Sequence, residues 1–376
     1  NLCTEILLHT KPTEYEDGEV VNVGETAVCN LASVNLENHI KVRTLDWKKL
    51  QETVEVAVRG LDNVIDINFY PTKEARNSNL RHRPVGLGIM GTHGMLHKLG
   101  ITYDSQEAVE LCGKIQEFIS YHAILTSSKL AKEKGHYDSY EHSEWSYGNL
   151  PVDTYCRLMK HRGQKDVSPS DLETMDWSKV REHIALHGMR NSNVMAIAPT
   201  ATISYIQGCS QSIEPDYSVL FVYSTLSGEF TMINEHFVEA AKKKGIWCQQ
   251  LIDALKAADG DVMAIDLPKD IQQKFKTAFD VSANSLISAA ACRQIWIDMG
   301  QSFNLYNKGT SLKYLNDIYT NCWEQGLKTT YYLRSKSATR VEKSTVEEVV
   351  KEENIEDSLE NVKACAINDP DCESCQ

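Results

Sequence analysis

The chain has 376 residues, of which 42% are hydrophobic and 24% charged, a composition typical of a globular protein with a substantial core. Its net charge of −13 and the lack of any Lys/Arg cluster interleaved with aromatic residues argue against a polynucleotide or an anionic membrane as a partner, because both need a basic surface. The longest uncharged stretch, 191–213, is polar and contains Pro199, and no secretory or transit pattern opens the chain, so a cytoplasmic location is expected.

The hydrophobic periodicity predicts helices along most of the chain. From Asp46 to Asn68, apolar residues recur at spacings of three and four, which is typical of an amphipathic helix. A second helix is predicted from a capping box at Asp104–Glu107 to Ala131, and it ends before Gly135. Further helices are predicted at 177–187, 234–244, 282–305 and 311–325, the last closed by Gly326.

Short apolar or β-branched runs lie between these helices, at 85–89, 192–198 and 327–333. Strands that alternate with helices indicate a largely parallel α/β architecture. The composition changes near Thr339, because 340–376 holds eleven Asp/Glu against four Lys/Arg and almost no aromatic residue. We therefore expect an α/β body over 1–338 and a flexible acidic tail over 339–376.

The glycines Gly86, Gly88 and Gly91 fit the G-x-G-x-x-G pattern of dinucleotide-binding turns. Arg81–Pro84 leaves room for only a short strand before them, and the acidic residues about twenty positions later fall in a predicted helix cap. The favoured interpretation is structural: the glycines let a strand pack closely on a helix.

A short apolar strand at 192–198 runs into a turn that begins with proline and is rich in hydroxyl groups. Backbone N–H groups and Ser/Thr hydroxyls converge on phosphates in such turns, although an ordinary capped helix has the same composition. The candidate phosphate-binding residues are Pro199, Thr200, Ala201, Thr202, Ile203 and Ser204.

The chain has eleven cysteines, an odd number that argues against a disulfide framework and for reduced thiols. Cys372 and Cys375 stand in C-x-x-C spacing at the end of the predicted tail. Two such thiols can form a disulfide and exchange it, so the pair is predicted to shuttle electrons. The alternative is half of a zinc site, for which a second C-x-x-C is missing, and no metal is expected to bind this chain directly.

Asn1, Cys3 and Glu5 alternate at the start of the chain and would share one face of an extended segment. An amide, a thiol and a carboxylate side by side can orient hydroxyls, exchange hydrogen and act as a general base. Cys29, taken alone, is predicted to be a core cysteine, because free cysteine is among the most buried residue types. The adjacent Tyr331 and Tyr332 are either a structural pair on opposite faces of a strand or two stacked phenols that relay an oxidising equivalent.

The residues of these segments and their order along the chain resemble the catalytic large subunit of ribonucleotide reductase. The resemblance rests on an ordered set of motifs that spans nearly the whole chain and corresponds to about the C-terminal half of that subunit. The motifs are Asn-Leu-Cys-Thr-Glu-Ile (1–6), Ala-Val-Cys-Asn-Leu (27–31), Pro-Thr-Ala-Thr-Ile-Ser (199–204), Ser-Ile-Glu-Pro (212–215), the tyrosine pair and the terminal C-x-x-C. It implies the C-terminal part of a ten-stranded α/β barrel with a finger loop at its start.

The resemblance also implies roles in the reduction of ribonucleotides, expected to be diphosphates, to deoxyribonucleotides. Cys3 would be the transient thiyl radical, Glu5 the base on the 3′ hydroxyl, and Asn1 a hydrogen-bonding partner of the sugar. Cys29 would be one of two reducing thiols, the other lying in the N-terminal portion of the subunit. The phosphate-binding turn would hold the substrate diphosphate, and the Cys372/Cys375 pair would be recharged by thioredoxin or glutaredoxin.

Two sources of the radical are known in the family. In one class a separate small subunit with a di-metal cofactor generates it and passes it along tyrosines, and the pair Tyr331 and Tyr332 favours this class. In the other, adenosylcobalamin does so on the same chain. In the favoured small-subunit class, no cofactor is expected to bind this chain directly; adenosylcobalamin is the alternative.

The chain begins with Asn inside a motif, so we expect it to be a piece of a longer polypeptide that is inactive without its N-terminal portion. Unpaired sheet edges would then favour tight association with that portion. Outside the family, a thiol–disulfide oxidoreductase or a non-catalytic scaffold are the alternatives.

Overall fold

The computed structural model describes residues 3–164, 166–225, 228–308 and 311–335. Its α-helices are α1 (Trp47–Ile67), α2 (Lys73–His82), α3 (Thr92–Leu99), α4 (Gln106–Lys134), α5 (Pro151–His161), α6 (Pro169–Leu172), α7 (Ser178–His187), α8 (Ile203–Ile206), α9 (Glu235–Lys243), α10 (Gln249–Ala257), α11 (Lys269–Lys274), α12 (Ala283–Gln294) and α13 (Leu312–Glu324). Its strands are β1 (Glu14–Glu16), β2 (Glu19–Asn22), β3 (Asn30–Asn35), β4 (Ile40–Lys41), β5 (Thr44–Leu45), β6 (Val85–Met90), β7 (Leu220–Thr225), β8 (Gly228–Ile233), β9 (Leu305–Asn307) and β10 (Leu333–Ser335). Short 3₁₀ helices are η1 (Leu36–His39) and η2 (Val262–Ala264).

Parallel backbone pairing runs through five neighbouring segments and confirms the predicted α/β class. β3 pairs with β6 in parallel, and a parallel bridge joins Leu87 of β6 to Met195. A further parallel bridge joins Ile197 to Gln301, and β9 pairs with β10. The order is therefore β3, β6, 193–197, 299–307 and 331–335. Within the described ranges this sheet does not close on itself, so the barrel remains a proposal.

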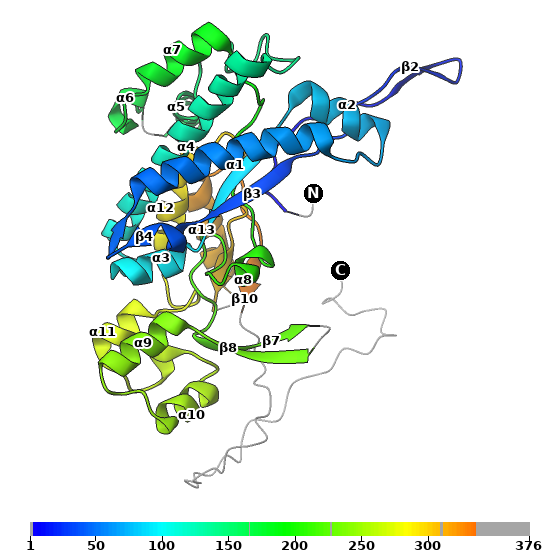
Figure 1. The fold of residues 1–376 in the computed structure, drawn as a ribbon. Coiled ribbons are helices and arrows are strands. Elements are labelled where there is room, and N and C mark those ends of the chain that lie inside the picture. The colour runs from blue at the N-terminus through cyan, green and yellow to red at the C-terminus, as the bar shows by residue number, and fades with distance from the viewer. Residues whose placement is uncertain (1–2, 165, 226–227, 309–310, 336–376) are drawn as a thin grey trace. The chain divides into compact units, whose positions relative to one another are not determined.

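The helix predicted at 46–68 is confirmed as α1. The Asp46 side chain caps it by accepting the Lys49 N–H at 3.0 Å. Its buried face, formed by Leu50, Val54, Val58, Leu61 and Ile65, packs on β3 and β6. Each such side chain contributes about 1.5–3 kcal/mol through burial. Figure 1 shows α1 crossing beside β3, so the helix covers one face of the sheet's first strands.

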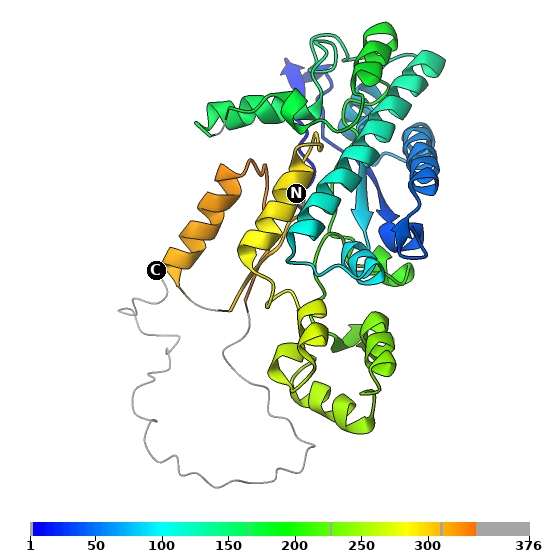
Figure 2. The ribbon, with the colours of Figure 1, turned by 90° about the vertical axis from the view of Figure 1, so that its left-hand side faces the viewer.

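The second predicted helix is confirmed as α4, but its cap was assigned one residue too early. Ser105, not Asp104, is the N-cap, and its side chain accepts the Ala108 N–H at 3.1 Å. Asp104 instead pairs with Lys276 at 2.8 Å. α4 packs against α1, α7 and α12, which explains why apolar residues surround most of it; Figure 2 shows α4 and α12 side by side.

The prediction of one helix over 282–305 is wrong in its second half. α12 ends at Gln294, and the chain then enters the sheet through the segment that contains Gln301. The apolar residues after 294 are buried without forming a helix face: Trp296 stacks on Trp177 at the start of α7, and Phe303 and Leu305 lie in the core. The helices predicted at 177–187, 234–244 and 311–325 are confirmed as α7, α9 and α13.

The glycines of β6 pack against neighbouring strands, not against a helix as predicted. A Cβ at Gly86 would lie 2.4 Å from a side-chain carbon of Leu31, on β3. A Cβ at Gly88 would lie 2.5 Å from the carbonyl oxygen of Ala196 on the other side. The absence of side chains therefore lets three strands lie close together here.

A second hydrophobic core lies around α9, α10 and α11, next to the antiparallel hairpin β7–β8 (Figure 1). Phe237 and Phe275 lie at its centre, with their ring centroids 5.3 Å apart. No helix among the described residues is long and apolar enough to cross a bilayer. The predicted acidic tail, 339–376, falls outside those residues, so the division at 338/339 stays a prediction.

Candidate active site

The first described residues of the chain lie along the strand segment 300–302. The Gly300 N–H donates to the carbonyl of Glu5 at 2.8 Å, and the Thr4 N–H donates to Ser302 Oγ at 3.1 Å. Ser302 Oγ in turn donates to Glu5 Oε2 at 2.5 Å. The Glu5 carboxylate, only 3% exposed, is thereby held in one orientation at a dry site, as a general base requires.

Gly300 permits this close approach of the two segments. A Cβ at this position would lie 2.8 Å from the carbonyl oxygen of Thr4 and 2.7 Å from Oγ1 of Thr329. Thr329 also accepts the Gln301 N–H at 3.1 Å and donates to the Gln301 carbonyl at 2.8 Å. The strand that orients Glu5 is thus fixed from both sides.

Cys3 lies next to the tyrosine pair. Its thiol donates to Tyr331 Oη at 3.7 Å, within hydrogen-bonding range for sulfur. The rings of Tyr331 and Tyr332 lie 3.8 Å apart, with their planes inclined at 33°. The rings lie together because the regular strand β10 begins only at Leu333. A hydrogen bond with Tyr332, followed by burial and the contact with Cys3, raises the pKa of Tyr331, so its phenol stays protonated.

Cys29 lies immediately before β3 and is half-buried, with its sulfur 3.6 Å from the position that a Cβ of Gly86 would take. Burial raises the pKa of the Cys29 thiol, and the charges of Asp298 and Glu5 raise it further. The sulfur therefore stays a neutral S–H. A protonated thiol is a donor of hydrogen and reducing electrons rather than a nucleophile.

Asp298 fixes two strands beside Cys29, a role that the sequence did not reveal. Its carboxylate accepts the N–H groups of Val194 and Met195 at 2.7 and 2.8 Å. Burial raises the pKa of Asp298, against the effect of these hydrogen bonds and of Lys328. Lys328 Nζ donates to the carbonyl of Asp298 at 2.7 Å. Asp298 and Lys328 together hold the ends of the two segments in register next to the Cys29 thiol.

The candidate phosphate-binding turn leaves the carboxyl end of the segment 193–197, the edge where parallel sheets bind ligands. Thr200 adopts a left-handed φ of 52°, and its Oγ1 accepts the Ser212 N–H at 2.8 Å. The side chain of Ser204 is buried and its hydroxyl has no partner among the described residues. Ala201, Thr202 and Ile203 are exposed, so the turn lies at the surface of the described residues.

Glu214 is a buried carboxyl group on the segment that follows this turn. Burial raises its pKa to about 7, although the Asn304 N–H, a hydrogen bond with Tyr306 and the charge of Arg293 oppose the shift. The Asn304 N–H lies 3.1 Å from Glu214 Oε1. Near neutral pH this group can therefore hold or release a proton.

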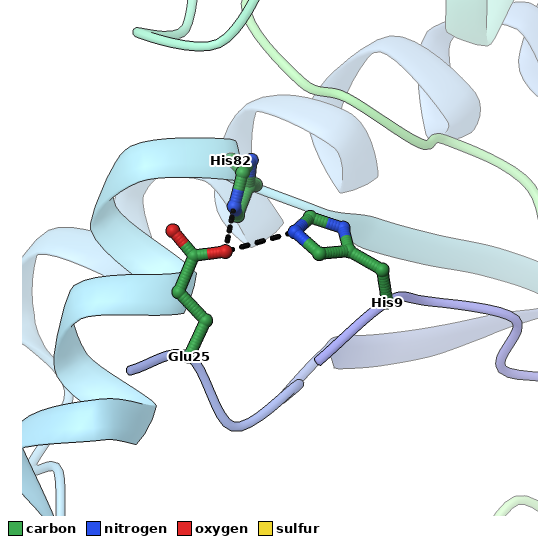
Figure 3. A group of neighbouring side chains, drawn as sticks. All are labelled: His9, Glu25 and His82. Atoms are coloured by element: carbon green, nitrogen blue, oxygen red, sulfur yellow. Dashed lines mark hydrogen bonds and ion pairs between the residues drawn. The ribbon is translucent and has the colours of Figure 1, made fainter. Parts of the chain in front are cut away.

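A further group, shown in Figure 3, anchors the segments that carry Glu5 and Cys29. Nε2 of His9 and Nε2 of His82 lie 2.8 and 2.9 Å from the same oxygen, Oε2 of Glu25. Arg81 binds the other oxygen of Glu25 at 2.7 Å. Burial alone would raise the pKa of Glu25, but hydrogen bonds from His82 and His9, the charge of His82 and Arg81 lower it to about 2. A permanent negative charge thus ties three segments together.

A cavity of about 470 Å³ opens beside His9 and His82 and extends to Trp145 and Asp298. Because Asp298 contributes to both, the cavity adjoins the strand ends near Cys29. The second nitrogen of His82 lies 2.5 Å from Ser139 Oγ, which fixes the ring at the cavity wall.

The structure brings together Cys3, Glu5, Tyr331 and Tyr332, and it places Cys29 within the electrostatic reach of Glu5. Asn1, Cys372 and Cys375 lie outside the described residues, so their predicted places are untested. Ser302, Asp298 and the Glu25 group are not predictable from the sequence, because each acts through a contact between distant segments and no local pattern marks it.

Comparison with known proteins gives the same family as the resemblance. The profile of the family described as "Ribonucleotide reductase, barrel domain" matches residues 1–333. A ribonucleoside-diphosphate reductase subunit alpha from Chlamydia muridarum is 52% identical over 348 residues, which cover 92% of this chain and 32% of the relative. The large subunit from Caenorhabditis elegans is 37% identical over 92% of this chain and 42% of its own length.

A subunit alpha from Helicobacter pylori is 40% identical over 93% of this chain and 40% of the relative. The chain therefore spans about a third to two fifths of the length of these curated relatives. The family profile covers residues 1–333 of 376, so the chain belongs to the ribonucleotide reductase family and matches its barrel domain.

Proposed function

We propose that this chain contributes the radical site to the reduction of ribonucleoside diphosphates to 2′-deoxyribonucleotides, in complex with the N-terminal portion of a large subunit. The observation that carries the proposal is the 3.7 Å contact between the Cys3 thiol and the Tyr331 phenol, beside the oriented carboxylate of Glu5. It brings a hydrogen donor and a redox-active ring, both partly buried, close to a buried carboxylate that can act as a base. The relatives' names supply the substrate class.

The tyrosines would serve as the last relay before the substrate. An oxidised Tyr331 takes the hydrogen atom of the Cys3 S–H, which restores the phenol and leaves a thiyl radical on Cys3. The stacked ring of Tyr332 offers the preceding step, at a centroid distance of 3.8 Å. The raised pKa of Tyr331 suits this role, because the phenol must carry the proton that moves with the electron.

The thiyl radical would then take the 3′ hydrogen of the ribose, while Glu5 accepts the proton of the 3′ hydroxyl. Asn1 would hydrogen-bond the sugar. Cys29 and a second thiol, from the N-terminal portion, supply two electrons and two protons as water leaves C2′, and they form a disulfide. The 3′ hydrogen finally returns from Cys3, which regenerates the thiyl radical. The protonated state of Cys29 supports its role as a donor.

The substrate diphosphate would bind at the turn Pro199–Ser204, whose central residues are exposed at the carboxyl end of a parallel strand. Cys372 and Cys375 would reduce the disulfide formed by Cys29 and pass the oxidation to thioredoxin or glutaredoxin. Each exchange moves two electrons from a dithiol to a disulfide, so the cycle is balanced.

A partner small subunit would hold the di-metal cofactor that starts the radical. The relative from C. elegans is named a large subunit, which supports a partner of this kind over the adenosylcobalamin alternative. The parallel segments of this chain would form the C-terminal part of a ten-stranded barrel completed by the N-terminal portion, with Cys3 on a finger loop within it.

The test combines this chain with a matching N-terminal portion and measures deoxynucleotide formation with no addition, with a metal-loaded small subunit, or with adenosylcobalamin. We expect activity only with the small subunit. Tyr331→Phe, Tyr332→Phe and Cys3→Ser should each abolish it. Tyr319→Phe, on the outer face of α13, is the matched control and should retain activity.

Activity with adenosylcobalamin alone, unaffected by the Tyr331 and Tyr332 substitutions, would refute the relay. Activity of the isolated chain would refute the need for the N-terminal portion. Insulin reduction that survives Cys3→Ser would instead support a thiol–disulfide oxidoreductase.

A further inference from the structure

A group of histidines lies apart from the Cys3 site, on α3. His93 and His97 are four residues apart, so their side chains leave the same face of the helix. Their ring centroids lie 4.0 Å apart, and the residues are 2% and 4% exposed. Asp216 completes the group, since its Oδ2 lies 3.3 Å from Nδ1 of His93.

The hydrogen bonding of these two rings is incomplete. Nδ1 of His93 accepts the backbone N–H of Asp216 at 2.9 Å. Nε2 of His93 and both ring nitrogens of His97 are buried without a hydrogen-bond partner in the part of the chain that the structure describes. Because Nδ1 of His93 accepts, its Nε2 carries the ring proton and cannot bind a cation. Buried polar atoms are nearly always paired, so the two bare nitrogens of His97 are the observation that indicates a missing bound species.

The group in Figure 3 offers an instructive contrast. There, two histidines also meet a carboxylate, but both Nε2 atoms bind Glu25, Arg81 binds its second oxygen, and Ser139 binds the second nitrogen of His82. That group is complete as an ion-pair network. The group on α3 has the same residue types and lacks the partners.

We propose that His93, His97 and Asp216 bind a divalent transition-metal ion, for which zinc is the best match. Two imidazoles and a carboxylate are borderline ligands that suit Zn²⁺. Their candidate ligand atoms all lie within 4.8 Å of one another. The 3.3 Å between His93 Nδ1 and Asp216 Oδ2 is the spacing of two ligands that are each ~2.1 Å from a tetrahedral ion.

In this arrangement the ion takes the lone pair of Nδ1 that the Asp216 N–H now occupies, and His97 turns one of its free nitrogens to it. Neither nitrogen of His97 has a hydrogen-bond partner among the described residues, so the neutral ring has a lone pair to offer. Water fills the fourth position.

Outer groups support the ligands and the charge. Asn234 Nδ2 donates to Asp216 Oδ2 at 2.5 Å, which orients the carboxylate. Glu37 lies 3.2 Å from His236 Nε2, and the ring of His236 lies 5.5 Å from that of His97. Glu37 is also paired with Lys98, at 3.5 Å, so Asp216 is the carboxylate of the group that would balance the ion's charge.

The location indicates a structural role. The ring of Phe275, from the second hydrophobic core, stacks on His97 at 4.6 Å. Thr92, at the start of α3, donates to the Ser212 carbonyl at 3.3 Å, four residues before Asp216. An ion at this point would join α3, the segment 212–216 and the second core. The site is independent of the proposed reaction.

The experiment measures the metal content of the full chain, purified without added metal and dialysed against a chelator-free buffer, by inductively coupled plasma mass spectrometry. We expect about one zinc per chain, and zinc X-ray absorption with nitrogen and oxygen neighbours only. His97→Gln should lose the zinc, whereas His9→Gln, in the complete network of Figure 3, should keep it. Sulfur neighbours, or equal zinc in His97→Gln, would overturn the proposal.

A second variant separates a metal site from a mere polar defect. His97→Phe fills the same space beside Phe275 and cannot bind metal. With zinc present, we expect the wild-type chain to melt at a higher temperature than with a chelator, and His97→Phe to melt at the same temperature in both. Two results together would overturn the proposal: the metal-free wild-type chain melts at the same temperature with and without zinc, and His97→Phe melts at a higher temperature than the wild type. They would show that no metal occupies the group.

Discussion

Ser302 Oγ donates a hydrogen bond to the carboxylate of Glu5 at 2.5 Å and at the same time accepts the backbone N–H of Thr4 at 3.1 Å. One hydroxyl thus aligns the proposed base and the backbone next to Cys3. The side chain of Ser302 is fully buried, so a water molecule could take over its hydrogen bonds only if a cavity opened beside Glu5.

Ser302→Ala should lower kcat of the complex about tenfold to a hundredfold with little change in KM, because a hydrogen bond to a charged group contributes ~1.5–3 kcal/mol. Steady-state kinetics with the N-terminal portion and small subunit measure this. Ser302→Thr keeps the hydroxyl and should recover most of the rate. An equal loss in both variants would mean that Ser302 only fills space.

Gly300→Ala should destabilise the chain and displace the Cys3 segment. The new Cβ would lie 2.8 Å from the Thr4 carbonyl, which is backbone and cannot rotate away. We expect a loss of about 1–3 kcal/mol, the usual cost of overpacking, in urea unfolding.

Gly60→Ala is the matched control for this change. Gly60 lies inside α1 with nothing within 4 Å of the new Cβ, so the same substitution should stabilise the chain by roughly 0.5–1 kcal/mol through helix propensity. Equal effects of the two substitutions would contradict the close approach at Gly300.

Glu25→Gln should cost about 3 kcal/mol at pH 7, since it removes one partner from a buried ionic group. The lowered pKa of Glu25, about 2, means that its stabilisation is complete above pH ~4.5 and disappears as the pH falls toward 2. The difference in the free energy of unfolding between the two proteins should therefore shrink in acid. Glu133→Gln, which breaks the exposed pair with Arg59, should have little effect at any pH.

Glu214 should make the chain less stable as the pH rises toward neutrality. Its pKa of about 7 in the folded chain exceeds the ordinary value of 4.5, so the unfolded chain releases this proton first. The free energy of unfolding should fall between pH ~4.5 and 7 by an amount on the order of 3 kcal/mol. Glu214→Gln should flatten this part of the pH profile; an unchanged slope would show that another group is responsible.

Much of the secondary structure could be predicted because local patterns determine it. α1 has a capping aspartate and a regular apolar stripe, and its bounds agree with the prediction within one residue at each end. The prediction of a helix over 295–305 was wrong because its apolar residues are buried on several sides, Trp296 against Trp177 for example, and a buried non-helical segment has no periodicity that distinguishes it from a buried helix.

The sequence identified the candidate residues of the proposed site, whose chemistry stays a prediction, but not the residues that hold them in place. Cys3, Glu5 and the tyrosine pair carry distinctive residue types in a recognisable order. Ser302 and Asp298 are ordinary residues whose importance depends on which strand lies beside them. His93 and His97 stand at helical spacing, a signal that could have been read, but Asp216 comes from a segment more than a hundred residues away, a separation that spacing alone does not bridge.

The contact between Cys3 and Tyr331 joins residues 328 positions apart, and that between Glu5 and Ser302 joins residues 297 apart. Contacts of such separation form late, because the intervening chain must first be ordered. During synthesis, the first residues of this chain would leave the ribosome long before their partners exist. The contact between Cys3 and Tyr331 therefore forms only when the fold is complete. On the proposed mechanism, a misassembled chain would have no tyrosine beside its thiol and would not be oxidised there.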